Sequence, residues 1–121
     1  MIKKVDTPFV VLHKGQKFQV VQTPDFAAWL PAQRDRRAVA KISDRILRMA
    51  DGNFGDVKDE GQGVSALRID YGPGYRVYFS QRGSKLIVLL CGGDKRRQGR
   101  DIAYAKRLKS ELDRGGGVAP V

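Results

Sequence analysis

Cysteine and histidine are almost absent from this chain. Its 121 residues include one Cys, Cys91, and one His, His13. A disulfide within the chain is therefore impossible, and zinc sites, which need about four Cys or His ligands or three with a water, are excluded. A Ser–His or Cys–His nucleophile pair would have to use His13, which lies in a polar N-terminal stretch. Because Cys91 ends an apolar stretch, we expect it to be a small core residue and not a reactive thiol.

Long apolar runs are also lacking. The longest, Leu86–Cys91, has the length of a buried strand, far short of the roughly 20 residues that a transmembrane helix needs. Near the N-terminus, the apolar run Pro8–Leu12 is too short for a signal peptide. We therefore expect a cytoplasmic protein with no membrane partner.

Acidic residues are few relative to basic ones. The chain carries 23 Lys and Arg against 13 Asp and Glu, a formal net charge of +10 at pH 7. Arg outnumbers Lys by 13 to 10, and its planar guanidinium can bind two phosphate oxygens at once. A small basic domain of this kind is expected to bind a polyanion, usually a nucleic acid or an acidic protein.

Hydrophobic periodicity predicts one domain over residues 18–114, after an N-terminal extension (1–17) and before a flexible tail (115–121). The extension is expected to hold either an extra strand, at Phe9–Leu12, or a loose leader. Within the domain the predicted order is strand 18–23, helices 25–30 and 34–50, strands 64–71, 75–81 and 85–91, and helix 101–114. The Gly-rich segment 52–63 is expected to be a mobile or tightly turned loop.

This order predicts an α+β fold. The sheet is expected to be mostly antiparallel and four-stranded, with the two N-terminal helices and the C-terminal helix packed on one face. Strand 85–91 is apolar on both of its faces, so we expect it at the centre of the sheet. The second face of the sheet would then be available for binding.

The hairpin of strands 64–71 and 75–81 predicts a polar cluster on that open face. A register that pairs the apolar residues of both strands on one face places Asp70 opposite Arg76, and Arg68 opposite Tyr78, on the other. Further cations follow the next strand or lie in the Gly-rich loop. We expect Lys95 to join the cluster and the following side chains to bind RNA phosphates: Lys58, Arg96, Arg97 and Arg100.

A cluster of cations suits a phosphodiester, because it can stabilise the extra charge of a pentavalent transition state. In RNA the ribose 2′-hydroxyl can be the nucleophile, so neither a metal nor a protein nucleophile is required. Without a suitable His, the candidates for general base are Asp70, Tyr78 and a Lys with a pKa lowered by neighbouring cations, for which we choose Lys95. The same residues could instead be ordinary cross-strand pairs on a solvated face, each stabilising the hairpin by about 0.2–1 kcal/mol.

Four motifs occur in an order that resembles one protein family. They are GNFGDVK at 52–58, GVSALRI at 63–69, GPGYRVYF at 72–79 and LLCGGDK at 89–95. The set is similar to the addiction-module killer proteins, a HigB-like branch of the RelE/ParE toxin superfamily, and the likeness extends over about residues 18–112. It implies a RelE-like fold and a toxin neutralised by a small antitoxin, often a helix-turn-helix protein.

The resemblance also implies an activity, namely ribosome-dependent cleavage of messenger RNA without a cofactor. Family catalytic positions map onto Arg76 and onto the basic segment at Lys95 and Arg96, with Arg68 a looser match. Two departures affect the site. The Tyr that some relatives carry on the last helix falls near Ile102, which leaves that acid–base role vacant, and Ala66 stands where relatives usually have Glu.

Two other functions stay open on the sequence. The first is inhibition of DNA gyrase by a ParE-like toxin, in which case the basic sheet face need not matter. The second is a non-catalytic, basic RNA-binding domain.

Overall fold

The computed structural model describes residues 17–115 in full and the backbone of residues 10–14. Its elements are β1 (Val10–Lys14), β2 (Gln19–Gln22), α1 (Pro24–Trp29), α2 (Arg36–Ala50), β3 (Val57–Gly61), β4 (Val64–Ile69), β5 (Tyr75–Arg82), β6 (Leu86–Asp94), the short 3₁₀ helix η2 (Lys95–Arg97) and α3 (Gln98–Gly115). The expectations for residues 1–9 and 116–121 lie outside the described residues. Within the described ranges, no helix has both the length and the apolar character needed to cross a membrane.

The fold is α+β, as expected, but the sheet is larger and mixed. The described strands form one six-stranded sheet in the order β1-β2-β6-β5-β4-β3, in which β2 and β6 run parallel and every other pair is antiparallel. The prediction of four strands is therefore wrong. β1 corresponds to the extra strand that was one of the two alternatives for the N-terminal extension, and β3, which was missed, lies in the segment expected to be a loop. β6 is central, as its apolar character on both faces predicts.

β3 escaped prediction because the glycines around it conceal a hairpin. Gly61, Gln62 and Gly63 all have positive φ, of 90°, 55° and 78°, and connect β3 directly to β4. Glycine adopts this left-handed backbone at little steric cost. The high glycine content of the segment therefore marks a tight turn between two paired strands.

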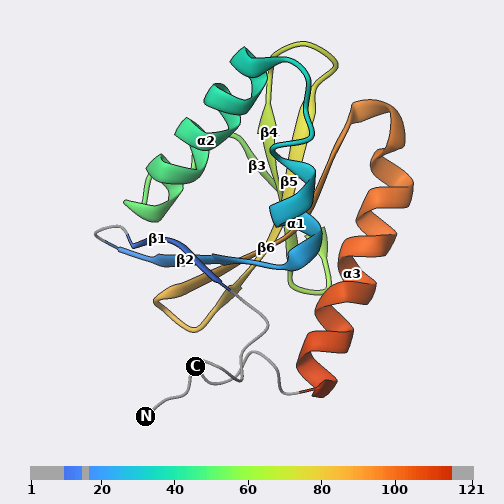
Figure 1. Cartoon of the computed structure of the whole chain (residues 1–121). Coiled ribbons are helices and arrows are strands. Elements are labelled where there is room, and N and C mark those ends of the chain that lie inside the picture. The colour runs from blue at the N-terminus through green and yellow to red at the C-terminus, as the bar shows by residue number, and fades with distance from the viewer. Residues whose placement is uncertain (1–9, 15–16, 116–121) are drawn as a thin grey trace.

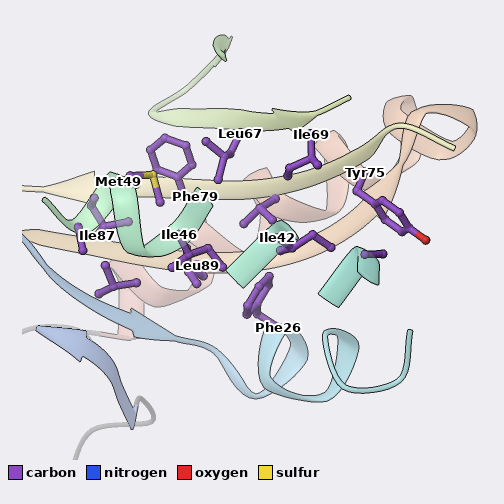
Figure 2. Close-up of a cluster of buried hydrophobic side chains, with 14 residues drawn as sticks. Phe26, Ile42, Ile46, Met49, Leu67, Ile69, Tyr75, Phe79, Ile87 and Leu89 are labelled. Carbon is purple, nitrogen blue, oxygen red and sulfur yellow. The ribbon is translucent and has the colours of Figure 1, made fainter. Parts of the chain in front are cut away.

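Helices α1 and α2 cover one face of the sheet (Figure 1). α2 presents Ile42, Ile46 and Met49, all buried, to the inward side chains of the central strands. Figure 2 shows these residues against Leu67, Phe79, Ile87 and Leu89, with Phe26 of α1 closing one side of the cluster. This is the larger of the two apolar clusters.

Helix α3 covers the opposite face, which the sequence predicted to be open. Ala105 is fully buried there against Val64, Tyr78 and Leu90, and the half-buried Ile102, Leu108 and Leu112 pack around them. The expectation that all helices lie on one face is therefore wrong. β6 is apolar on both faces because α1 and α2 pack on one of them and α3 on the other.

The β4–β5 hairpin has the predicted facing but not the predicted register. Arg68 pairs with Arg76, and Ala66 pairs with Tyr78, two residues away from the expected partners. A two-residue shift keeps every side chain on its face, so an alternating pattern does not distinguish the two registers. The shift follows from a longer connection, since β4 ends at Ile69 and Asp70 lies in the turn, outside the ladder.

Two glycines at the end of β6 allow helices to approach from both faces. A Cβ on Gly92 would lie 2.3 Å from Cε3 of Trp29, and a Cβ on Gly93 would lie 1.9 Å from Oδ2 of Asp101. Trp29 is held in place from the start of its helix, because the Thr23 hydroxyl donates to the Leu90 carbonyl (2.7 Å) and accepts from the Phe26 amide (3.1 Å). The space that two side chains would fill is thus occupied by α1 on one face and by α3 on the other.

Gly92→Ala is expected to destabilise the fold by about 1–3 kcal/mol, because the new methyl group must displace the Trp29 ring or shift the strand. Urea unfolding followed by circular dichroism measures the change. The matched control is Gly99→Ala, since a Cβ at Gly99 in α3 meets nothing within 4 Å. That variant should be neutral or stabilising by up to about 1 kcal/mol. Equal stabilities for the two variants would contradict the close packing of Trp29 on Gly92.

Candidate functional site

A cross-strand row brings two arginines and a glycine together at one end of the central strands. Arg68 of β4 pairs with Arg76 of β5, and Arg76 pairs with Gly93 of β6. Paired residues point to the same face, and here that face is the one covered by α3. Both arginines are half-buried. The row therefore places both arginines on the α3 face of the sheet, with Gly93 at the end of the row that lies against Asp101 of α3.

Arg68 is neutralised by a carboxylate in the free protein. Its Nε and Nη2 atoms donate to Oδ1 of Asp56 at 3.0 and 2.7 Å. This hydrogen bonding lowers the pKa of Asp56, with further contributions from the charges of Arg68, Arg45 and Arg76. Arg45, which extends from α2, donates to the carbonyls of Arg68 (2.7 Å) and Phe54 (3.2 Å) and so holds the Asp56 segment against β4.

Among the described residues, Arg76 hydrogen-bonds to backbone carbonyls and to no carboxylate. Its Nη1 donates to the carbonyls of Gly74 (3.2 Å) and Tyr75 (3.3 Å). A Cβ on Gly74 would lie 3.3 Å from Cβ of Lys95 and 3.5 Å from Nη1 of Arg76, so Lys95 and Arg76 approach the same glycine. Arg68 and Arg76 are therefore neighbours in the row, and the Cβ of Lys95 lies beside Gly74 at the same end of the strands.

The basic segment after β6 forms the short 3₁₀ helix η2. Asp94 caps η2, accepting from the Arg96 amide at 2.9 Å. The basic side chains that follow are exposed: Lys95, Arg96, Arg97 and Arg100. α3 begins at Gln98, so these cations lie around its N-terminus.

A half-open depression of about 280 Å³ lies next to the row. Trp29 and Gln33 border it on the α1 side, and Arg96, Arg97 and Asp101 border it on the α3 side. Gly92, Gly93, Asp94 and Tyr75 complete its lining. Gly93 and Tyr75 are respectively the partner and the chain neighbour of Arg76, so the depression and the arginine row share an edge.

Two residues of the predicted cluster lie elsewhere. Tyr78 is fully buried under α3, and its hydroxyl is buried with no hydrogen-bond partner among the described residues. Burial, followed by the nearby charge of Asp101, raises the pKa of Tyr78. Asp70 is exposed in the hairpin turn. The expectation that Tyr78 and Asp70 share an open surface with Arg68 and Arg76 is therefore wrong.

Lys58 lies at the edge of the sheet rather than in a loop. It pairs with Ala66, which places its side chain on the α3 face, and it is exposed.

Cys91 is buried, as expected, and burial raises the pKa of its thiol to about 12.

Sequence reasoning missed two carboxylates of this region. Asp56 was not considered because its segment was expected to be a loop, although it lies within the quoted GNFGDVK motif. Asp101 was expected only to begin the last helix and was given no role in the site. The glycine pair before Asp94 was a usable signal, because adjacent glycines in an apolar strand indicate close approach by another element.

Within the described ranges, no three or more His, Cys, Asp or Glu are grouped so as to hold a metal ion.

The fold and site define a small, basic α+β protein with a mixed sheet, helices on both faces and cations gathered at one end of the central strands. The chain is 49% identical over 94 residues to an uncharacterized protein of Haemophilus influenzae strain Rd, an alignment that covers 78% of this chain and 95% of that protein. The chain belongs to the same family as that protein. No family model matches the chain. No solved structure matches it either.

Asp56→Asn is expected to strengthen binding to a polyanion by more than the added unit of charge accounts for. The substitution leaves the Arg68 guanidinium without its carboxylate, so a second arginine of the row becomes available. The salt concentration at which the protein elutes from a heparin column measures this change.

The charge-matched control is Asp44→Asn. Asp44 pairs with Arg48 at 2.9 Å in an exposed ion pair on α2, so this variant carries the same net charge. We expect Asp56→Asn to elute at clearly higher salt than Asp44→Asn. Identical elution would show that the row is not part of the polyanion-binding surface.

Proposed function

We propose that this protein is the toxin of a type II toxin–antitoxin pair and acts as a ribosome-dependent mRNA endoribonuclease. The observation that supports the proposal most strongly is that Nη1 of Arg76 and the Cβ of Lys95 both lie beside Gly74, with Arg68 next in the row. The ordered motifs that resemble the RelE/ParE superfamily give the class of substrate. The proposal uses no metal and no cofactor.

Charge is arranged as phosphodiester cleavage requires. Arg76 has no carboxylate partner among its hydrogen bonds, so its charge can act on a bound phosphate. Lys95 is exposed on the same side of Gly74 and provides a second cation. Cations fixed beside the phosphate stabilise the negative charge that develops on its oxygens as the fifth bond forms.

Exposed cations around the row bind the RNA phosphates on either side of the reacting one. Arg96, Arg97 and Arg100 surround the start of α3, and Lys58 lies at the far edge of the same sheet face. Such contacts position a strand without reading its sequence. In this proposal the ribosome supplies the alignment of the messenger, which is the role that the family resemblance implies for it.

Partners follow from the same proposal. A small antitoxin, of helix-turn-helix type in the branch that the motifs resemble, neutralises the protein by binding it. The gyrase-inhibitor and the non-catalytic RNA-binding functions are distinguished from cleavage by the experiment below.

Arg76→Ala is expected to slow cleavage of mRNA on programmed ribosomes by about 100- to 1,000-fold, the usual effect of removing one donor that stabilises transition-state charge. Primer extension on mRNA after mixing ribosomes with purified protein measures the rate. The control is Arg48→Ala, which removes an exposed arginine of α2 that pairs with Asp44, and it should cleave like the wild type. Circular dichroism confirms that both variants fold.

Three results would contradict the proposal. Cleavage by Arg76→Ala at the wild-type rate would remove Arg76 from the reaction. Intact mRNA with the wild-type protein, together with inhibited DNA supercoiling, would establish the gyrase function instead. Salt-sensitive RNA binding without cleavage would establish a binding domain.

A further inference from the structure

The carboxyl group of Asp101 occupies the place of a missing side chain in the sheet. Gly93 has no side chain, and a Cβ built there would lie 1.9 Å from Oδ2 and 2.8 Å from Cγ of Asp101. Gly93 is the direct partner of Arg76 on the α3 face. Asp101 thus extends the cross-strand row, so that Arg68, Arg76 and the Asp101 carboxyl group follow one another across β4, β5 and β6.

Within the described part of the chain, one oxygen of this carboxyl group is buried without the hydrogen bond that buried carboxyl oxygens normally accept. Oδ2 of Asp101 is buried and has no hydrogen-bond partner among the described residues. Desolvation raises the pKa of Asp101, Arg97 and Arg100 oppose that rise, and Asp94 adds to it. The other groups that face it are Tyr78, whose pKa it helps to raise, and Cys91, whose thiol donates to the Asp101 carbonyl (3.8 Å). A buried carboxyl oxygen that lacks a hydrogen bond weakens the fold, and groups perturbed in this way are concentrated at functional sites.

Asp101 is nevertheless reachable, because it lines the depression that shares an edge with the arginine row. Arg96 and Arg97 border the same depression, and Lys95 adjoins it after Asp94. A phosphodiester bound by Arg76 and Lys95 would have its ribose beside the depression. Tyr78, in contrast, is fully buried.

We propose that Asp101 is the general base of the reaction, taking the proton from the ribose 2′-hydroxyl of the nucleotide bound at the depression. The inference rests on the proposed function. As the 2′-oxygen forms its bond to phosphorus, its proton passes to the Asp101 carboxylate. The bond between phosphorus and the 5′-oxygen breaks, its electron pair stays on that oxygen, and a proton from water completes the new 5′-hydroxyl. The products are a 2′,3′-cyclic phosphate and a 5′-hydroxyl end.

Asp101→Asn tests this assignment, because the amide has nearly the same shape and does not accept the proton. Single-turnover cleavage on programmed ribosomes should fall by about 100-fold or more. The wild-type rate should rise with pH through the acidic range as the carboxyl group ionises, and this rise should be missing from the variant. Thermal unfolding of Asp101→Asn should occur at the wild-type temperature or higher, because the amide removes the cost of desolvating the carboxylate.

A second substrate shows whether Asp101 acts as a general base or as a general acid. If sulfur replaces the 5′-oxygen at the cleaved linkage, the leaving group needs no proton, so loss of a general acid is rescued and loss of a general base is not. We expect the defect of Asp101→Asn to persist on this substrate. The charge-matched control, Asp44→Asn, should cleave both substrates at the wild-type rate.

Each remaining outcome overturns the assignment. Rescue by the sulfur substrate would make Asp101 an acid, and a lowered unfolding temperature with an unchanged pH profile would make it structural. If the wild-type protein cleaves mRNA and Asp101→Asn cleaves it at the same rate, the role of Asp101 is contradicted but the proposed function is not. No cleavage by the wild-type protein would remove both.

Discussion

Two adjacent glycines at the end of β6 set the arrangement on which the site depends. They lie on a central strand whose two faces are both covered, so side chains there would collide with the neighbouring helices. Gly92 admits the Trp29 ring from one face, and Gly93 admits the Asp101 carboxyl group from the other. Because both helices close on the same two residues, α1 and the start of α3 form opposite walls of one depression. The packing of the fold and the shape of the candidate site therefore have the same origin.

The two arginines of the site differ in their partners, because Arg68 is paired with a carboxylate and Arg76 is not hydrogen-bonded to any carboxylate of the described residues. Arg68 is hydrogen-bonded to Asp56, whereas the hydrogen bonds of Arg76 within the described part of the chain go to backbone carbonyls. The pairing of Arg68 with Arg76 places like charges opposite each other, which is unfavourable in a ladder. Asp56 relieves this repulsion in the free protein. A bound phosphate would do the same for Arg76, so the unfavourable pairing becomes useful when an anion binds.

The sequence predicted the class of fold and the central place of β6, because hydrophobic periodicity reports burial directly. It did not predict the hairpin register, since the two-residue shift leaves the facing of Arg68 and Arg76 unchanged. Placing all helices on one face overlooked a signal that was present, because the strand that became β6 was recognised as apolar on both faces. Such a strand needs cover on both, and α3 supplies the second. β3 was missed because the glycines of its turn made the segment look like a loop. The role of Asp101 could not be predicted, because it depends on a tertiary contact with Gly93 that leaves no periodic pattern in the sequence.

In the proposed reaction, RNA provides its own nucleophile, the arginine row binds the phosphate and Asp101 takes the proton. A messenger with a single 2′-deoxynucleotide on the 5′ side of the cleaved linkage tests this claim most directly, with mass spectrometry of the 3′ ends as the measurement. We predict that the all-ribose messenger yields 2′,3′-cyclic phosphate ends and that the deoxy substitution abolishes cleavage at that linkage alone. Cleavage at the deoxy position, or ends with a free 3′-hydroxyl, would contradict the account.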